Sequence, residues 1–474
     1  MNIGIQREIA KGTVLTVDYV RNIGTHFLLS VDENHTGDAA FLNQPAALNA
    51  INTTNEAFGC GPITPGAPGT ANLSGISCAI ENGATIADYA GNGLDSPKDL
   101  NVGACPSPFG GIGAPCAFGG TNPNVGPTAF LEPIGRSLYN AMDIKLTKNS
   151  TNPLPGIKYL NGQVSYTLSR FKYCGSSNGL ASPGTPENQD QDFIDAALDN
   201  RSPCRFYGPT LLDRTDQLNF GGYADVPGGF RLGLVGHIWS PLAITPLLND
   251  PGSSGAPGAI FVSDFTGDGT VDDPLPLGQT DPTCGSYGGS CNYKLAGTGA
   301  FGRSLSPKGL TRAVNAYNGV IANNTVTPAG QALINAGLIT ESQLIALGAT
   351  PSTITYVDPS DPTGATLIPG VIPREVGPSW MKTVDLQISW VGHVGERLTI
   401  EPSVGFFNVF NFRNWDASGN TLSGALSGAG GSINGTFGNG VNGIGTRTNA
   451  IGTGTGVFSL GAPRAIEWGL KFTF

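Results

Sequence analysis

Several short segments of the chain alternate apolar and polar residues, and the last segment is the clearest. Over residues 466–474 the apolar side chains are followed in turn by small, polar or charged ones. A period of two places one set of side chains on each face of a β-strand. One face is therefore wholly apolar and ends in aromatic rings. Such a face suits lipid, although an edge strand of a soluble β domain is the alternative interpretation.

Similar alternation predicts about nine strands. The segments that carry it are residues 3–9, 15–29, 137–147, 163–168, 218–220, 230–238, 384–390, 398–406 and 466–474. Short connections and long connections follow one another along the chain. The long, irregular connections are approximately residues 34–133, 174–212, 243–377 and 413–462. Outer-membrane β-barrels have this asymmetry, with tight periplasmic turns and long outer loops, whereas a soluble β-sandwich is not expected to sort its loops so cleanly.

Composition narrows the class of protein further. The chain has 70 Gly and 35 Pro, only 13% charged residues, and a net charge of -10, which argues against nucleic acid as a partner. No apolar stretch approaches the roughly 18 to 20 residues of a transmembrane helix, so a chain that spans a membrane must do so as a closed barrel. Residues 1–30 show no signal peptide. We therefore expect the C-terminal part of a longer protein, or a truncated reading frame.

The eight cysteines fall into four close pairs, and all of them lie in the long loops. The candidate disulfides are Cys60/Cys78, Cys105/Cys116, Cys174/Cys204 and Cys284/Cys291. Eight cysteines allow 105 pairings, so this connectivity is a hypothesis. Disulfides would staple Gly- and Pro-rich segments and would fit an oxidising compartment. The spacing does not match a zinc site.

One loop segment resembles a calcium-binding loop. Asp264, Thr266 and Asp268 fall at positions one, three and five, Gly269 falls at position six, and Asp272 at position nine. Position twelve lacks the usual Glu, and an Asp/Gly-rich turn is the alternative. Calcium is therefore the one cofactor that we consider, and otherwise we expect none.

A second loop segment is the one helical patch that the sequence indicates. Residues 327–348 carry Pro328 at a first helical position, a capping box from Thr340 to Gln343, and glycine stops. We expect a small helix pair that packs the loop, rather than a ligand-binding lid. The four histidines are scattered and no nucleophile elbow or catalytic triad is present, so we expect no enzyme.

Four motifs, spread over almost the whole chain, resemble those of Oar-like TonB-dependent outer-membrane receptors. The first is Arg7, Gly12-Thr13-Val14-Leu15, Tyr19-Val20 and Gly24-Thr25-His26, and the second is Ser165-Tyr166-Thr167-Leu168-Ser169 followed by Leu212-Asp213-Arg214. The third is Phe406-Phe407-Asn408-Val409-Phe410-Asn411, and the fourth runs from Ala462-Pro463-Arg464 to Phe474. The end also resembles the signal that the barrel assembly machinery reads for insertion. In that signal the matching positions are Glu467, Gly469, Phe472 and Phe474.

The resemblance implies a bacterial outer-membrane barrel of about 22 strands, of which this chain supplies about the last nine. It also implies a plug and a contact site for TonB, neither of which is visible in the sequence. The implied function is capture and energy-coupled uptake of a bulky solute by the intact protein. The main alternative is a surface adhesin or binding protein that transports nothing, and a third is a secreted β-rich enzyme. The sequence does not identify the ligand.

Overall fold

The computed structural model describes most of the chain. The described residues are 1–34, 39–67, 70–96, 115–120, 122, 128–174, 195–196, 199, 201–209, 213–241, 243, 247–248, 257–269, 273–279, 293–295, 307–351, 353–357, 367–369, 380–395, 398–414, 421–422 and 460–474.

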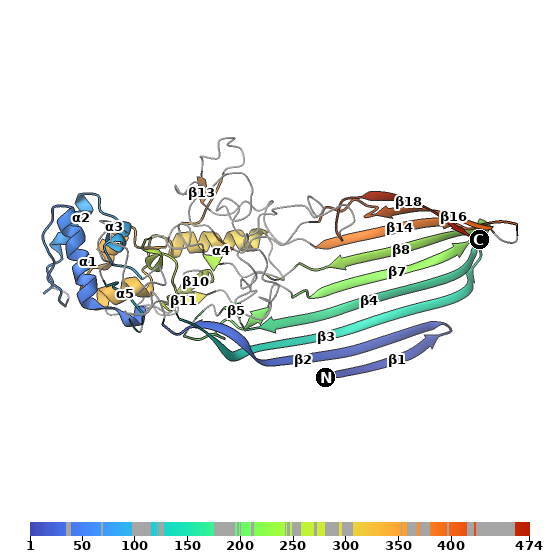
Figure 1. The fold of residues 1–474 in the computed structure, drawn as a ribbon, viewed down its shortest axis with the longest axis horizontal. Coiled ribbons are helices and arrows are strands. Elements are labelled where there is room, and N and C mark those ends of the chain that lie inside the picture. The colour runs from blue at the N-terminus through green and yellow to red at the C-terminus, as the bar shows by residue number, and fades with distance from the viewer. Residues whose placement is uncertain are drawn as a thin grey trace.

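The main feature of the fold is one large antiparallel sheet in which nine long strands lie side by side in chain order (Figure 1). Short strands extend this sheet at its margins. The long strands are β1 (Asn2–Ala10), β2 (Thr13–Asp32), β3 (Ala129–Leu154), β4 (Ile157–Tyr173), β7 (Asp216–Val226), β8 (Phe230–Trp239), β14 (Met381–Trp390), β16 (Leu398–Phe407) and β18 (Ala465–Thr473). The short ones are β5 (Asp195–Ala196), β6 (Gly208–Pro209) and β15 (Gly392–Val394). The nine long strands match the nine that alternation predicts.

Helices and small two-stranded pairs occupy the long connections. The helices are α1 (Gln44–Ala57), α2 (Ser74–Glu81), α3 (Ile86–Gly91), α4 (Pro307–Val320), α5 (Pro328–Asn335) and α6 (Glu341–Ala346), with 3-10 turns η1 (Ala39–Phe41), η3 (Pro227–Gly229) and η4 (Ala259–Phe261). The pairs are β10 (Pro276–Gln279) with β11 (Tyr293–Leu295), β12 (Thr355–Val357) with β13 (Leu367–Pro369), and β9 (Leu247–Leu248) with β17 (Thr421–Leu422). No helix in the described part of the chain is long and apolar enough to cross a lipid bilayer.

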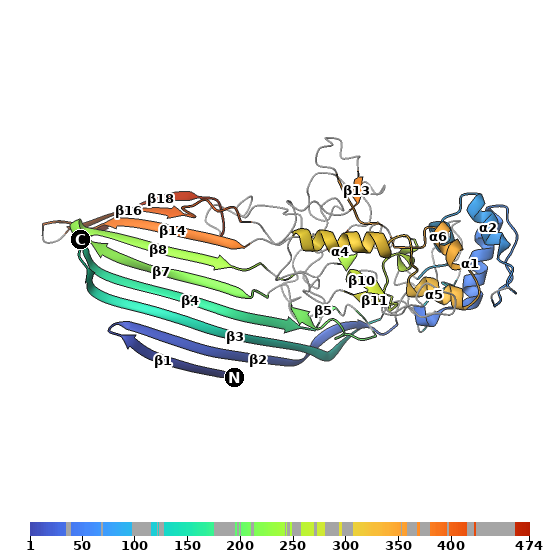
Figure 2. The ribbon, with the colours of Figure 1, turned by 180° about the vertical axis from the view of Figure 1, so that it is seen from behind.

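The connections are sorted by length between the two ends of the sheet. Tight turns join β1 to β2, β3 to β4, and β7 to β8 at one end, where the C-terminus also lies (Figures 1 and 2). Gly12 in the first turn has φ +65, and a Cβ there would lie 2.1 Å from the Asn149 carbonyl oxygen, so the turn requires glycine. The long connections all leave from the opposite end. This arrangement confirms the predicted loop asymmetry.

The register divides the sheet into an apolar face and a polar face that continue across the strands. On the apolar face, one row pairs Ile5 with Val17, Val17 with Ile144, and Ile144 with Tyr166. A neighbouring row on the polar face pairs Thr16 with Lys145, Lys145 with Ser165, and Ser165 with Asn219. The apolar side chains are uncovered; Trp468 in β18, for example, is 81% exposed. So large an exposed apolar surface is stable against lipid and not against water.

The sheet is curved but open. β1 pairs only with β2 and β18 pairs only with β16, so the described strands leave one edge unpaired on each side. In the described part of the chain, β18 therefore does not close onto β1.

The loops contain more helix than the sequence indicates. The helix pair at 327–348 is present as α5 and α6, but the first loop, which we expected to be irregular, contains α1, α2 and α3. Two of these helices begin at residues that stabilise a helix N-terminus: the Asn43 side chain caps α1, and Thr85 and Asp88 form a capping box for α3. α2 and α3 are short, and the apolar residues of all three helices form a core together with residues of a second loop.

Candidate functional site: the helical cap and the polar face

Two long loops that are far apart in sequence fold together beyond the loop end of the sheet. We call this unit the helical cap and define it as residues 39–67, 70–96, 115–120, 257–263 and 325–349. Its core joins Tyr89 and Phe118 from the first loop to Phe261 and Leu333 from the third, all fully buried. The Phe118 and Phe261 rings meet edge to face with centroids 5.8 Å apart. The cap is therefore one packed unit, because neither loop could bury its apolar side chains alone.

Hydrogen bonds between the two loops fix how the helices of the cap are placed. The Gln343 side chain caps its own helix through Thr340, and its Nε2 also donates to the Leu73 carbonyl and the Ser77 hydroxyl, each at 3.0 Å. The Gly258 amide donates to an Asp95 carboxylate oxygen at 2.9 Å. The Gln343 side chain thus forms hydrogen bonds within both loops, and these bonds rigidify the cap.

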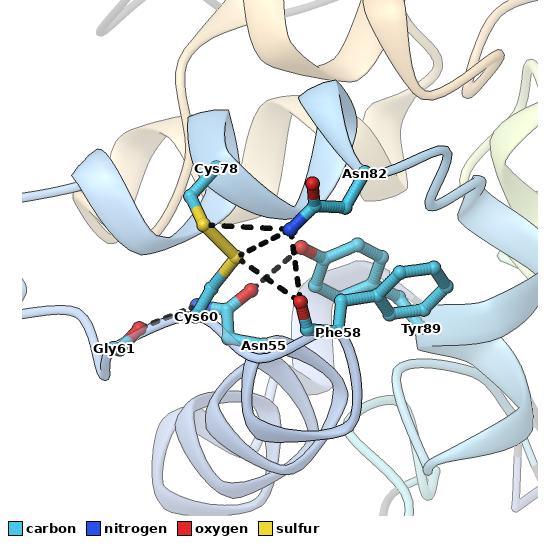
Figure 3. Close-up of a disulfide and its surroundings, with 7 residues drawn as sticks. All are labelled: Asn55, Phe58, Cys60, Gly61, Cys78, Asn82 and Tyr89. Carbon is cyan, nitrogen blue, oxygen red and sulfur yellow. Dashed lines mark hydrogen bonds between the residues drawn. A yellow bond between two sulfur atoms is a disulfide. The ribbon is translucent and has the colours of Figure 1, made fainter.

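A disulfide joins α2 to the segment that follows α1 within the cap (Figure 3). Cys60 and Cys78 are bonded, with their Cα atoms 5.9 Å apart. Beside them, Asn82 Nδ2 donates to the Phe58 carbonyl at 2.9 Å, and the buried Tyr89 hydroxyl donates to Asn55 Oδ1 at 2.7 Å. Burial raises the pKa of Tyr89, so its hydroxyl stays a hydrogen-bond donor at physiological pH.

A second disulfide fixes the loop that follows β4. Cys174, at the end of that strand, is bonded to Cys204, and Cys174 is fully buried. Two of the four predicted pairs are therefore disulfides in the structure. Cys116 is also disulfide-bonded. The remaining three cysteines of the prediction lie outside the described residues: Cys105, Cys284 and Cys291.

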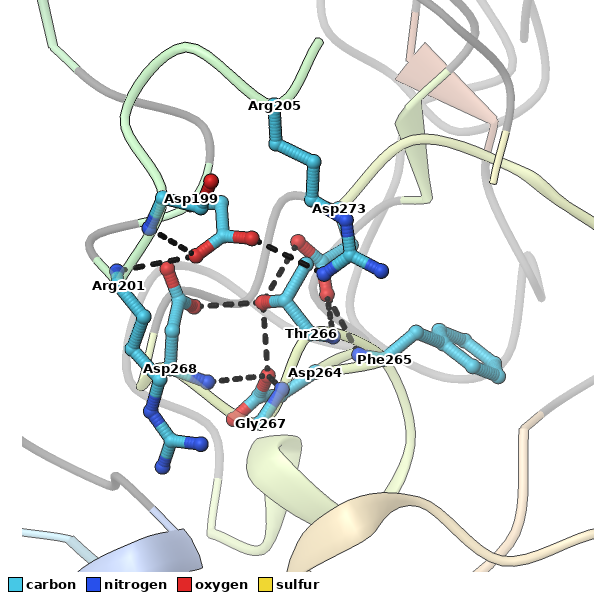
Figure 4. Close-up of polar contacts among 10 residues, drawn as sticks. Asp199, Arg201, Arg205, Asp264, Phe265, Thr266, Gly267, Asp268 and Asp273 are labelled. Carbon is cyan, nitrogen blue, oxygen red and sulfur yellow. Dashed lines mark hydrogen bonds and ion pairs between the residues drawn. The ribbon is translucent and has the colours of Figure 1, made fainter. Parts of the chain in front are cut away.

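The predicted calcium loop forms a compact acidic turn (Figure 4). The Gly267 amide donates to Asp264 Oδ1 at 2.6 Å, and the Thr266 hydroxyl donates to Asp268 Oδ1 at 2.7 Å. The Thr266 amide donates to Asp273 Oδ2 at 2.7 Å. Sequence reasoning selected Asp272, which lies outside the described residues, and missed its neighbour Asp273; a run of two acids was the only signal available.

The acidic turn is electrostatically unfavourable when its carboxyl groups are ionised. Asp264 and Asp273 are fully buried, and burial followed by the neighbouring carboxylates raises both pKa values well above the usual range. Beside the turn, the Arg205 guanidinium forms an ion pair with Asp199 at 3.0 Å. In the described part of the chain, no group of three or more His, Cys, Asp or Glu side chains could hold a metal ion. Calcium binding here stays a prediction.

The polar face of the sheet carries a hollow that crosses β7, β8, β14, β16 and β18. The hollow has a volume of about 570 Å³ and lies between Tyr223 and Arg231 on one side and Glu467 on the other. Glycines such as Gly233 and Gly405 are among its lining residues. Arg231 pairs with Asp225 at 2.7 Å and lies over the Tyr223 ring at 4.4 Å. The face thus offers paired charges and room for a polar occupant.

The predicted insertion signal lies on β18, at the open edge of the sheet. Phe472 and Phe474 project on the apolar face and are 49% and 93% exposed. Glu467 and Gly469 lie on the polar face, at the rim of the hollow. The geometry keeps the two halves of the signal on opposite faces, as the alternation predicts.

An uncovered apolar face, a polar face and loops sorted by length define an outer-membrane β-barrel protein. The chain belongs to the outer membrane beta barrel domain family, whose model matches residues 1–448. It is therefore a protein of the bacterial outer membrane. Among solved structures it is similar to the outer membrane transporter YddB from Escherichia coli, at 7% identity and a TM-score of 0.36. That similarity covers 100% of this chain and 32% of the transporter. The comparison with curated proteins finds no match.

Proposed function

We propose that this chain is part of a TonB-dependent receptor that captures a bulky solute outside the cell and takes part in its energy-coupled uptake. The observation that carries the proposal is the helical cap, since two outer loops share one core at the loop end of a membrane-facing sheet. A rigid platform at that place suits capture, because binding to preorganised groups costs little ordering entropy.

In this proposal the nine strands belong to a closed barrel of about 22 strands. The unpaired edges of β1 and β18 support it, because an exposed edge in lipid leaves backbone groups without partners. The barrel assembly machinery would recognise β18, and TonB would act through a plug that the intact receptor supplies. The hydrated polar face would line the path of the solute. The proposal assigns no chemical reaction to the chain.

The second candidate function is an adhesin or binding protein that transports nothing. The cap favours it in one respect: its core and its Cys60–Cys78 disulfide would suit a binding module that needs no moving parts. The two functions differ in what happens after capture, since only a receptor takes the solute into the cell.

Solute depletion by living cells separates the two. Cells with and without the gene are grown on a complex extract, with and without a protonophore, and the remaining solutes are measured by mass spectrometry. We expect at least one solute whose depletion requires both the gene and the proton-motive force. Cys60→Ser with Cys78→Ser should reduce that depletion while the barrel still reaches the membrane. A solute that binds to the cell surface equally with and without the protonophore, and is not taken up, would favour the adhesin instead.

A further inference from the structure

The membrane-facing surface of the sheet carries a row of three residues, two of them basic, which lies about midway along β2 and β3 and near the loop end of β4. Arg21 on β2 pairs with Asn140 on β3, and Asn140 pairs with Arg170 on β4. Arg21 follows Tyr19 by two residues, and Arg170 follows Leu168 by two, so both arginines lie on the apolar face. The basic row, defined as Arg21, Asn140 and Arg170, thus interrupts a surface that is otherwise suited to lipid.

The position of the row matches the outer boundary of the membrane. On β3 the apolar face runs from Lys148 to Asn140, with Leu146, Ile144 and Met142 between them. Eight residues at about 3.4 Å each span roughly 27 Å along the strand, or about 20 Å after a tilt of about 40°. That height is close to the ~25 Å apolar band of outer-membrane barrels. Lys148 therefore lies at the turn-end boundary and the basic row at the loop-end boundary.

The two guanidinium groups are exposed and, among the described residues, neither forms an ion pair. Since adjacent strands lie about 4.8 Å apart, the Arg21 and Arg170 backbones are separated by roughly 10 Å. Long arginine side chains can cross that distance to one anion. Asn140 lies between them, and the Tyr19 hydroxyl donates to its Oδ1 at 3.1 Å, which leaves its amide hydrogens available.

We propose that the basic row binds the phosphate group of an anionic lipid in the outer leaflet. Guanidinium groups recognise phosphate through two parallel hydrogen bonds, and Asn140 can add a third donor from the strand between them. The acyl chains of the same lipid lie over the apolar residues below the row, Met142 and Leu168, which are 38% and 40% exposed. Charge above and hydrocarbon below are complementary to a phosphorylated lipid.

The test titrates the full chain, in detergent micelles, with fluorescent diphosphorylated lipid A. Arg21→Gln and Arg170→Gln are compared with Arg7→Gln, the matched control, which removes an equally exposed arginine from the apolar face at the turn end. An arginine near a charged membrane surface contributes a factor of about five in affinity. We expect each row variant to weaken binding ~5-fold, the double variant ~25-fold, and the control to bind like the unaltered chain.

Two further measurements complete the test. Lipid A without phosphate should bind the unaltered chain as weakly as the double variant binds the phosphorylated form. Inorganic phosphate at the same concentration should not displace the labelled lipid. Equal affinity for both lipids, an equal loss in the Arg7 variant, or displacement by inorganic phosphate would overturn the proposal. Heat-modifiable gel migration verifies that each variant is folded.

Discussion

Breaking the Cys60–Cys78 disulfide tests whether the helical cap is one cooperative unit. The bond closes a loop with a sequence separation of 18. In the chain-entropy model, a loop of that length contributes about 3 kcal/mol. Because α1 and α2 share their core with α5 and α6, Cys60→Ser with Cys78→Ser should destabilise both loops of the cap. The strands of the sheet should keep their stability, since the disulfide lies outside them.

Hydrogen exchange of the purified protein in detergent measures this effect segment by segment. A loss of about 3 kcal/mol raises the opening equilibrium by about two orders of magnitude. We expect faster exchange in 74–91 and, by a similar factor, in 328–346, although the latter segment contains neither cysteine. Cys174→Ser with Cys204→Ser is the matched control, because it removes the disulfide of the neighbouring loop.

The reasoning would be refuted if exchange rose in 74–91 while 328–346 stayed protected, since the two loops would then unfold independently. A uniform rise that included the strands would also refute it, because the cap would then not be separable from the sheet.

Three further predictions concern the sheet, the acidic turn and the chain end. Ile144→Arg on the apolar face should cost about 2–4 kcal/mol in chemical denaturation from lipid, whereas Ser165→Arg on the polar face should cost much less. The raised pKa values of Asp264 and Asp273 stabilise the turn fully below the unfolded pKa of about 4, and this stability is lost as pH rises through the folded pKa. Limited proteolysis between pH 4 and 8 should therefore show faster cleavage at higher pH, unless added calcium restores protection; pH-independent cleavage would contradict this. Phe474→Ala should slow assembly into the outer membrane, measured as heat-modifiable protein after pulse labelling, and unaltered assembly would count against its role in insertion.

The strands could be predicted from sequence because each one carries its own signal. A period of two is local, so Val17 or Ile144 identifies its face without knowledge of any partner strand. Tight turns have a local signal of their own, since Gly12 and its neighbours have the composition of such turns.

The helical cap could not be predicted in the same way. Gln44–Ala57 is rich in Ala, Asn and Thr, and its apolar residues are few; Ile51 lies in a core to which the third loop contributes Phe261 and Leu333. The basic row could not be predicted from the sequence for a related reason. Arg21 and Arg170 look like ordinary breaks in alternation, and only the strand register places them beside one another.

Epitope accessibility on intact cells tests the central claim most directly. One tag is inserted between Asn323 and Asn324, an exposed turn between α4 and α5, and another between Pro155 and Gly156, in the turn between β3 and β4. If the sheet spans the outer membrane with its long loops outside, antibody binds the first tag on intact cells and the second only after permeabilisation. Binding of the second tag on intact cells, with the first protected, would contradict the account.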